Sequence, residues 1–268
     1  MAIKKRSRTM LLALDVGNTM TKLGVFSGEK LLTDFQLASN RERTADEVGL
    51  SLKTLLADWP KPQAVIISSV VPHLNAALTR AFQRHFSVEP EFLSHRWGVI
   101  PLDVEEPSKV GTDRLADAIA AYYLYGGPAL TINFGTATTF NLVAEDGRFL
   151  GGAIAPQMEL AASALAQRAA QLYEVELHCP KSVIGKTTDD NIRAGFVLGF
   201  LDLVSGLIRR FRAEYSQDLK VIATGGRGEF FAKHIKEISV YDPHLTLQGL
   251  RLAWELHQGR RPRSPRQL

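Results

Sequence analysis

The chain has 268 residues, of which 45% are hydrophobic and 8% aromatic, the composition of an ordinary globular protein that can bury a large core. Its single cysteine, Cys179, excludes an internal disulfide and indicates a reducing compartment. No apolar run approaches the roughly 18 residues of a membrane span, and no signal-peptide pattern follows the basic start of the chain. We therefore expect a cytoplasmic protein that does not bind membranes.

The formal net charge of +4 comes from the two ends of the chain. Residues 1–9 and 259–268 carry four basic residues each and no acidic ones, so removing these eight charges leaves the rest of the chain at −4. A nucleic-acid surface needs a basic face or interleaved aromatic residues, and neither pattern is visible. We expect two solvated basic tails and no nucleic-acid partner.

The first half of the chain, residues 10–126, reads as strands followed by alternating strands and helices. The stretch 11–26 is expected to form a β-hairpin with Asp15, Asn18 and Thr19 at its turn. The other elements expected here are a strand at 29–39, a helix from a capping box at Thr44–Glu47 to about Asp58, a strand at 64–69, an amphipathic helix at 72–86, a short strand at 90–95 and a helix beginning near Asp113.

The second half, residues 127–258, restarts this order of elements. A strand over 129–134 runs into a turn at Gly135 and Thr136 and re-emerges as a strand. The other elements expected here are strands at 138–143 and 149–154 around a tight turn at Asp146–Gly147, helices at about 158–172 and 188–215, a strand at 220–224 ending at Gly225–Gly226, and helices near 229–238 and 247–257. Two copies of one strand–turn–strand device suggest two facing halves around a shared ligand.

The residues at these turns are suited to phosphate. Glycine-rich turns expose backbone N–H groups without side-chain obstruction, and threonine and asparagine add donors. Asp15 cannot bind phosphate directly, but it can hold Mg²⁺ or the waters of Mg²⁺. Gly225–Gly226 is a third glycine turn, at the end of a strand where nucleotide contacts often fall. Taken alone, each of these turns can be explained as a tight turn without a ligand. The three together, in this order along the chain, indicate a nucleotide site.

Eight segments carry a more specific pattern. They are DVGNTMTK at 15–22, SVVP at 69–72, PSKVGTDR at 107–114, FGTATTFN at 134–141, GRFLGGAIAP at 147–156, SVIGKTT at 182–188, ATGG at 223–226 and DPHLTLQGL at 242–250. Over residues 10–256 the chain resembles the type III pantothenate kinases of the actin, sugar kinase and acetate kinase superfamily. The resemblance implies an α/β fold of two similar actin-like (ribonuclease H-like) domains, 10–126 and 127–258, with a central nucleotide cleft.

The resemblance also implies an activity and a set of site residues. That family transfers the γ-phosphoryl group of ATP to the primary hydroxyl of pantothenate, the first step of coenzyme A synthesis. Asp113 corresponds to the proton acceptor, and Asp15 to the residue that meets Mg²⁺ at the phosphates. Pantothenate binding is implied for Gly111, Thr112, Asp113, Arg114 and Thr188. Nucleotide binding is implied for Asp15, Val16, Gly17, Asn18, Thr19, Met20, Thr21, Lys22 and Thr136. Family members are homodimers, and many need K⁺ or ammonium.

The chain departs from the family pattern at four positions. Many relatives have an aspartate that helps to hold the monovalent cation where this chain has Asn133, and an uncharged amide predicts a weak or absent cation site. Val104 replaces a tyrosine of some relatives and removes one possible contact to substrate. Gln157 and Thr187 stand where glycine and asparagine are usual. None of the four changes removes the base or a phosphate loop.

Plain structural explanations compete with several of these roles. Asp113 could be the N-cap of a helix beginning at Arg114, Arg114 could form a structural salt bridge, and Lys22 could be no more than a strand residue. Lys186 reads as a solvated lysine. Two other functions stay open: a kinase or nucleotide hydrolase acting on another small alcohol, and a non-enzymatic accessory factor in gene regulation, for which Asp113 would be dispensable.

Overall fold

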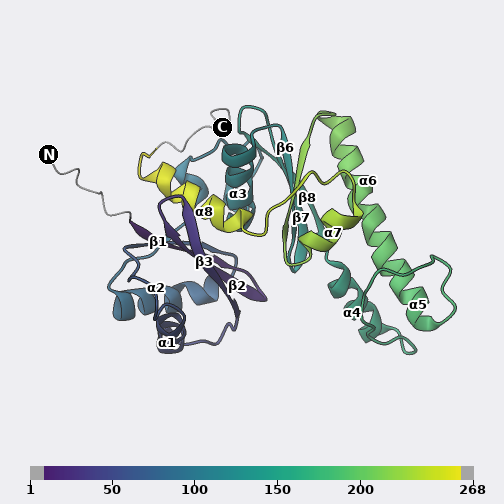
Figure 1. The fold of residues 1–268 in the computed structure, drawn as a ribbon, viewed down its shortest axis with the longest axis horizontal. Helices are drawn as coiled ribbons and strands as arrows, with labels where there is room; N and C mark the ends of the chain where they lie inside the picture. The colour runs from purple at the N-terminus through teal and green to yellow at the C-terminus, as the bar shows by residue number, and fades with distance from the viewer. Residues whose placement is uncertain (1–8, 261–268) are drawn as a thin grey trace. The chain divides into compact units, whose positions relative to one another are not determined.

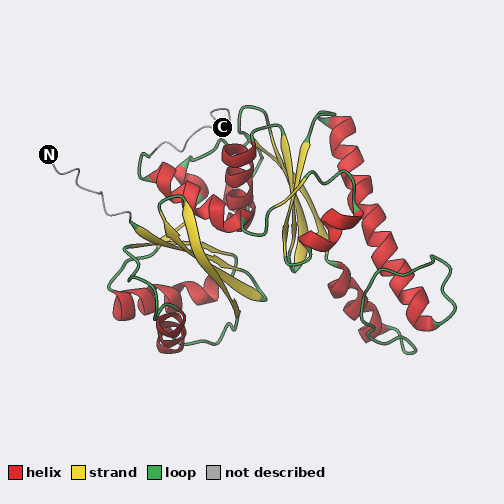
Figure 2. Ribbon diagram, viewed as in Figure 1, coloured by secondary structure: helices red, strands yellow, loops and turns green. Residues whose placement is uncertain are grey.

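The computed structural model describes residues 9–260 and divides into two compact units. The divisions fall between Leu124 and Tyr125 and between Pro243 and His244, so the chain leaves the first unit and returns to it. Each unit contains one sheet with helices beside it (Figures 1 and 2). The basic tails expected from the sequence lie outside the described residues except at Arg260, whose guanidinium lies 5.0 Å from the ring centroid of Trp254.

The sheet of unit 1 has five strands in the order β3-β2-β1-β4-β5. Its members are β1 (Met10–Val16), β2 (Met20–Ser27), β3 (Lys30–Ala38), β4 (Ala64–Ser69) and β5 (Glu91–Phe92). The first three strands form an antiparallel meander, and β4 and β5 continue the sheet in parallel pairing. This arrangement brings the carboxyl ends of β1 and β4 to the same edge of the sheet.

Two pairs of helices accompany this sheet. They are α1 (Ala45–Leu55) with α2 (Pro72–Phe86), and α3 (Thr112–Ala120) with α8 (Leu245–His257). Thr44 and Glu47 form the expected capping box at the start of α1, and Leu74, Leu78 and Phe82 of α2 are buried against the sheet. Figure 1 shows α1 and α2 on one side of β1–β3, and α3 and α8 on the other.

The close contact between α3 and α8 explains why the chain returns to unit 1. A Cβ atom built on Gly249 of α8 would overlap the backbone oxygen of Ala116 in α3, so only glycine permits this approach. The buried hydroxyl of Thr246 donates a hydrogen bond of 2.6 Å to the carboxylate of Asp117 in α3. Helix α8 therefore belongs to the core of unit 1.

Unit 2 repeats the sheet of unit 1. Its strands follow the order β10-β9-β6-β7-β8, with an antiparallel meander of three strands and two further strands in parallel pairing. The elements are β6 (Ala129–Phe134), β7 (Ala137–Val143), β8 (Phe149–Pro156), β9 (Lys220–Gly225), β10 (Val240–Tyr241), α4 (Met158–Arg168), α5 (Thr188–Arg193), α6 (Gly199–Glu214) and α7 (Gly228–His234). The predicted α/β fold with two similar halves is confirmed.

Most sequence-based element predictions are confirmed within a few residues, and three details differ. Helix α4 ends at Arg168, before the expected 172, and the short strand β10 was not expected. The expected division of the chain placed residues 244–258 in the second half, whereas α8 lies in unit 1. A local pattern of apolar residues identifies a helix, but it does not say against which sheet the helix packs.

The helix formed by α5, a π-helical segment at Ala194–Leu198 and α6 runs from Thr188 to Glu214 and is unusually apolar. By length and composition it could cross a membrane, with a mean hydropathy of 1.5 over 18 residues, so the expectation that no segment approaches this length is wrong. Phe200, Val204 and Ile208 pack into the core of unit 2, which is also how a core helix of a globular protein behaves. Leu203 is 37% exposed, so an apolar part of this helix is left uncovered.

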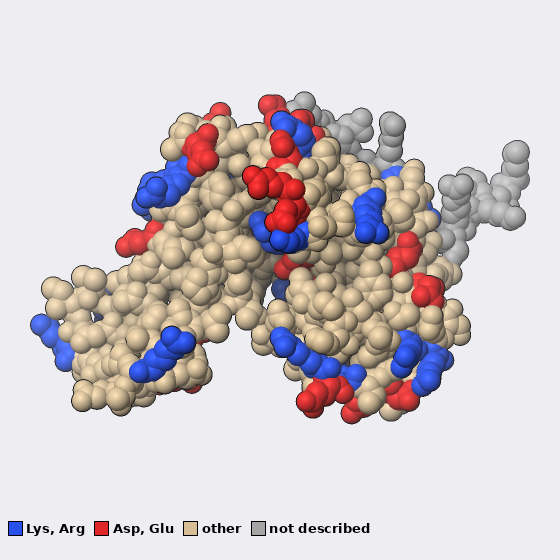
Figure 3. Space-filling view, turned by 180° about the vertical axis from the view of Figure 1, so that it is seen from behind, with Lys and Arg blue, Asp and Glu red and all other residues tan. Residues whose placement is uncertain are grey.

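The face of the molecule drawn in Figure 3 carries charges of both signs. In Figure 3, lysine and arginine side chains lie among aspartate and glutamate side chains, and most of this face carries neither. The described residues also form ion pairs, for example Arg193 with Asp189 and Lys233 with Glu229.

Candidate functional site

The first phosphate loop is the turn between β1 and β2. The backbone N–H of Gly17 donates to the carbonyl of Met20 at 3.0 Å, which closes the turn. A Cβ atom on Gly17 would lie 3.0 Å from that same oxygen, so the turn has little room for a larger residue. Asn18 and Thr19 are exposed at its tip. The structure thus brings the predicted residues 15–22 together in one hairpin.

Asp15 is the last residue but one of β1 and lies half-buried between two strands. It pairs with Lys22 of β2 across the antiparallel ladder and with Ser68 of β4 across the parallel one. Burial, and to a smaller extent the nearby charge of Asp113, raises the pKa of the Asp15 carboxyl to about 7. The charge of Lys22 and a hydrogen bond from Ser68 act in the opposite direction. The positive charge of Lys22 therefore acts on this carboxylate, and its role toward a ligand stays a prediction.

The second predicted group begins the helix α3. Gly111 is the N-cap residue, and Thr112 is the first residue of the helix. The Thr112 hydroxyl lies 2.9 Å from the hydroxyl of Ser68 and accepts a hydrogen bond of 3.1 Å from the backbone N–H of Ser69. These contacts join the start of α3 to the end of β4, beside the strand β1 that carries Asp15. Two segments about one hundred residues apart in the chain are held at one edge of the sheet.

Asp113 lies in the first turn of α3 and is half-buried. The N-cap of α3 is Gly111, so the alternative interpretation of Asp113 as an N-cap residue is wrong. Burial raises the pKa of Asp113, while a hydrogen bond of 2.8 Å from the backbone N–H of Arg114 and the charge of that residue oppose the shift. A Cβ atom on Gly111 would lie 2.5 Å from Asp113 Oδ1. Glycine at 111 therefore provides the space that this carboxylate occupies.

Arg114 lies between two carboxylates. Burial lowers its pKa, and the negative charges of Asp113 and Asp117 raise it again. Asp117 is fully buried, and Thr246 of α8 donates a hydrogen bond to it. The sequence analysis did not single out Asp117, although its spacing of three residues from Arg114 on a helix is a signal for such a pair. The buried charge of Asp117 therefore acts on the guanidinium of Arg114.

The predicted residues of unit 2 lie on three different elements. Thr136 is exposed in the turn between β6 and β7, which is closed by a hydrogen bond of 3.2 Å from Gly135 N–H to the carbonyl of Ala137. Asn133 is the last residue but one of β6, close to this turn, and Thr188 is the exposed first residue of α5. The structure thus brings Asn133 and Thr136 together, but it places Thr188 on a separate element.

Gln157 is a buried residue whose role the sequence analysis left open. Its Oε1 accepts a hydrogen bond of 2.9 Å from Met158 N–H at the start of α4, and a longer one of 3.4 Å from the hydroxyl of Thr138 beside the second loop. Its Nε2 has no hydrogen-bond partner among residues 9–260. Where relatives commonly have glycine, this chain therefore uses a side chain to cap a helix and contact the second loop.

The carboxylates of unit 1 fit a magnesium ion bound together with nucleotide phosphates. Asp15 and Asp113 are like charges in a half-buried position, so a nearby cation would relieve their repulsion. In the part of the chain that the structure describes, no group of three or more His, Cys, Asp or Glu side chains could hold a metal by itself. Such an ion would take its other ligands from phosphate oxygens and water, as Mg²⁺ usually does.

Solved structures with this architecture define the class of protein. The chain is similar to the activator of 2-hydroxyisocaproyl-CoA dehydratase from Clostridium difficile with bound ADPNP, with a TM-score of 0.55 and 12% identity over 96% of this chain and 100% of that one. It is also similar to a protein of Campylobacter jejuni described as a Baf family transcriptional activator, with a TM-score of 0.60 and 19% identity over 92% and 99% of the two chains. The two repeated sheets and their loops are those of the actin-like fold.

Sequence comparison then identifies the family. The family model described as type III pantothenate kinase matches residues 11–210. Relatives of that name from Moorella thermoacetica and Frankia casuarinae are each 43% identical, over 92% of this chain and 99% of each relative. The chain belongs to the type III pantothenate kinase family.

Proposed function

We propose that this chain transfers the γ-phosphoryl group of ATP to the primary hydroxyl of pantothenate and releases ADP and 4′-phosphopantothenate. Membership of the family supports this activity, and one observation supports the location of the chemistry. In unit 1, the carboxylates of Asp15 and Asp113 share the edge of the sheet where the first phosphate loop and the start of α3 meet. Phosphoryl transfer to an alcohol needs both a phosphate-binding loop and a proton acceptor.

Asp113 acts as the general base in this proposal. The hydroxyl proton of pantothenate passes to the Asp113 carboxylate as the oxygen forms a bond to the γ-phosphorus. The bond from that phosphorus to the oxygen of ADP breaks, and ADP carries away the electron pair. The raised pKa of Asp113 supports the role, because a carboxylate with a higher pKa accepts a proton more readily near neutral pH.

Asp15 and the loop of residues 15–22 receive the phosphates. Asp15 would hold Mg²⁺, which when bound neutralises charge on the transferring phosphoryl group. Backbone N–H groups of the turn, the amide of Asn18 and the ammonium of Lys22 meet the phosphate oxygens. In unit 2, we assign Thr136 to the nucleotide by the same chemistry.

Arg114 is the natural partner of the pantothenate carboxylate. Its guanidinium has five N–H donors in a planar fork, and the buried charge of Asp117 acts on it. Gly111 leaves space for Asp113, and Thr112 uses its hydroxyl to fix the loop to β4. We assign Thr188 of unit 2 to pantothenate on the family pattern alone.

Three further properties follow from the family and are part of the proposal. The protein is a cytoplasmic homodimer, and the uncovered apolar part of the helix Thr188–Glu214 is a suitable subunit contact. Its response to K⁺ or ammonium is weak, because Asn133 supplies an amide instead of a carboxylate. A role in gene regulation is the competing proposal, and it does not need the Asp113 carboxylate.

The test is ADP release from ATP and Mg²⁺, with and without pantothenate, for the wild type, Asp113→Asn and the control Asp58→Asn. Asp58 is exposed in the turn that follows α1, so its variant reports any effect of losing one surface carboxylate. We expect pantothenate-dependent turnover that falls by about 10³-fold in Asp113→Asn, within the range for loss of a general base, and is unchanged in Asp58→Asn. A wild type without pantothenate-dependent turnover would overturn the proposal.

A further inference from the structure

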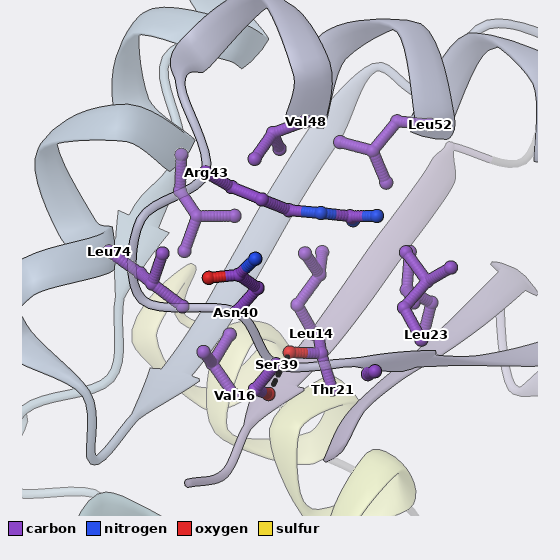
Figure 4. A pocket seen from close by; sticks show the side chains of 13 residues that line it. Leu14, Val16, Thr21, Leu23, Ser39, Asn40, Arg43, Val48, Leu52 and Leu74 are labelled. Carbon is purple, nitrogen blue, oxygen red and sulfur yellow. Dashed lines mark hydrogen bonds between the residues drawn. The ribbon is translucent and has the colours of Figure 1, made fainter. Parts of the chain in front are cut away.

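The loop between β3 and α1, residues 39–44, lies directly against the first phosphate loop. The backbone N–H of Ser39 donates a hydrogen bond of 2.9 Å to the carbonyl of Thr19. The hydroxyls of Ser39 and Thr21 are 2.8 Å apart, and Figure 4 shows this contact as a dashed line. The two loops are therefore held together by one backbone bond and one side-chain bond, and neither contact involves a charged group.

A charged contact joins the tips of the two loops. Arg41 Nη2 donates a hydrogen bond of 2.9 Å to Oδ1 of Asn18. Because a guanidinium has no acceptor, this bond determines that the oxygen of the Asn18 amide faces Arg41. The two N–H donors of that amide are then directed away from Arg41. Asn18 is thus oriented as a donor, which is what a phosphate oxygen requires.

The second arginine of the loop is placed differently. Figure 4 shows the side chain of Arg43 extending across an apolar pocket, among Leu14, Val48 and Leu52. Hydrogen bonds from Thr44 and, to a smaller extent, the charge of Arg43 hold the pKa of Glu47 below its usual range. Arg43 therefore contributes to packing and to the start of α1, whereas Arg41 is exposed and contacts the phosphate loop.

We propose that Arg41 is a positioning residue of the nucleotide site, which orients the Asn18 amide toward the phosphates and adds a positive charge to the loop that receives them. One of its five N–H donors is used by Asn18, and an exposed guanidinium beside a phosphate loop can offer the others to phosphate oxygens. The inference rests on the proposed function for the identity of the ligand as a nucleotide. It adds a residue from a third segment of the chain to the loop of residues 15–22.

The test compares nucleotides that differ only in their number of phosphates. Dissociation constants of ATP, ADP and AMP are measured by calorimetry without pantothenate, for the wild type, Arg41→Ala, Arg41→Lys and the control Arg80→Ala. Arg80 is exposed on α2 of the same unit, so its variant removes the same charge away from the loop. We expect Arg41→Ala to weaken ATP about tenfold, ADP less, and AMP not at all, with Arg41→Lys in between and Arg80→Ala unchanged.

A second measurement separates positioning from a general loss of structure. In Asn18→Ala, the additional substitution Arg41→Ala should weaken ATP less than it does in the wild type, because part of its effect acts through Asn18. Equal weakening of ATP and AMP, or no change for ATP, would overturn the inference. Because these measurements do not use pantothenate, a wild type that binds ATP but never phosphorylates pantothenate would overturn the proposed function alone.

Discussion

The two units use one backbone device with different side chains. Asp15 is the last residue but one of β1, and Asn133 is the last residue but one of β6. Each lies two residues before a glycine, Gly17 or Gly135, that closes the following turn with a backbone hydrogen bond. The cross-strand neighbours differ, as the register of each sheet shows. Asp15 lies between Lys22 and Ser68, whereas Asn133 lies between Thr139 and Thr224.

The two turns therefore share a backbone hydrogen-bonding pattern but differ in the charge of their side chains. Unit 1 has an acid and a base at the turn and a second carboxylate, Asp113, beside them, whereas the corresponding positions of unit 2 are neutral. Under the proposed function, the backbone of each turn would receive a phosphate, and the charged side chains of unit 1 would supply the chemistry. Giving unit 1 the neutral side chain of unit 2 should then greatly reduce turnover. Giving unit 2 the carboxylate of unit 1 should change only the response of the enzyme to monovalent cations.

The largest expected effect is that of Asp15→Asn, which gives unit 1 the side chain that unit 2 carries. Loss of the carboxylate removes the protein ligand for Mg²⁺, so we expect pantothenate-dependent turnover to fall by roughly 10²–10³-fold. The concentration of Mg²⁺ needed for half-maximal rate should rise as well. Turnover within threefold of the wild type would show that the carboxylate at this turn is not needed.

Asp15→Asn should also be more stable than the wild type at high pH. A folded-state pKa of about 7 lies above the usual 3.8 of Asp15, so the folded chain holds this proton more tightly than the unfolded chain does. The contribution of Asp15 to stability is therefore most favourable below pH 4 and is lost as the pH rises through 7. Without metal, Asp15→Asn should gain roughly 1–3 kcal/mol over the wild type at pH 8 and nothing at pH 4. Thermal unfolding across this range measures the difference, and Asp58→Asn is the control.

The next largest effect is expected at Gly111. A Cβ atom at this position would lie 2.5 Å from the Asp113 carboxylate, the end of a flexible side chain, so Gly111→Ala should displace the base without unfolding the helix. We expect turnover to fall about tenfold or more, with little change in melting temperature and in ATP affinity. Gly199→Ala is the matched control, because a Cβ atom there meets nothing within 4 Å. Equal activity of the two variants would count against Asp113 as the base.

Much of this arrangement could be predicted from the sequence, because its signals are local. The hairpin at Asp15, the capping box at Thr44 and the repeated turn at Gly135 each follow from a few adjacent residues. The contacts that place these residues are not local. Thr246 reaches Asp117 from 129 positions away, and Thr112 reaches Ser68 from 44 positions away.

Two incorrect predictions, for α8 and for the N-cap of α3, were also made from local sequence patterns. Helix α8 has an apolar pattern that either sheet could accept, and contacts with distant residues, such as that of Gly249 with Ala116, assign it to unit 1. The N-cap role considered for Asp113 was plausible from residue preference alone. The structure places the helix start at Gly111 instead, which moves the carboxylate of Asp113 into the first turn.

A smaller effect should distinguish the two loop glycines. A Cβ atom on Gly17 would meet a backbone oxygen at 3.0 Å, whereas one on Gly135 would meet its nearest atom at an ordinary 3.5 Å. Gly17→Ala should therefore destabilise the protein by about 1 kcal/mol more than Gly135→Ala does, since a backbone atom must move. Chemical denaturation of the two variants measures this difference. Equal stability would mean that the two turns are interchangeable in shape as well as in hydrogen bonding.

The smallest expected effect concerns Asn133→Asp, which gives unit 2 the carboxylate that unit 1 carries. We expect wild-type turnover to be nearly equal in K⁺ and Na⁺, and the variant to be about three- to fivefold faster in K⁺, because a charged oxygen ligand holds a cation that an amide holds weakly. Asn133→Ser is the control, since it removes the amide without adding charge. A strong K⁺ response in the wild type would mean that neighbouring oxygens such as Thr224 Oγ1, which is buried without a hydrogen-bond partner in the described chain, already suffice for the cation. In that case, the neutral turn of unit 2 would be an ion site in its own right, and the charge difference between the units would no longer separate their roles.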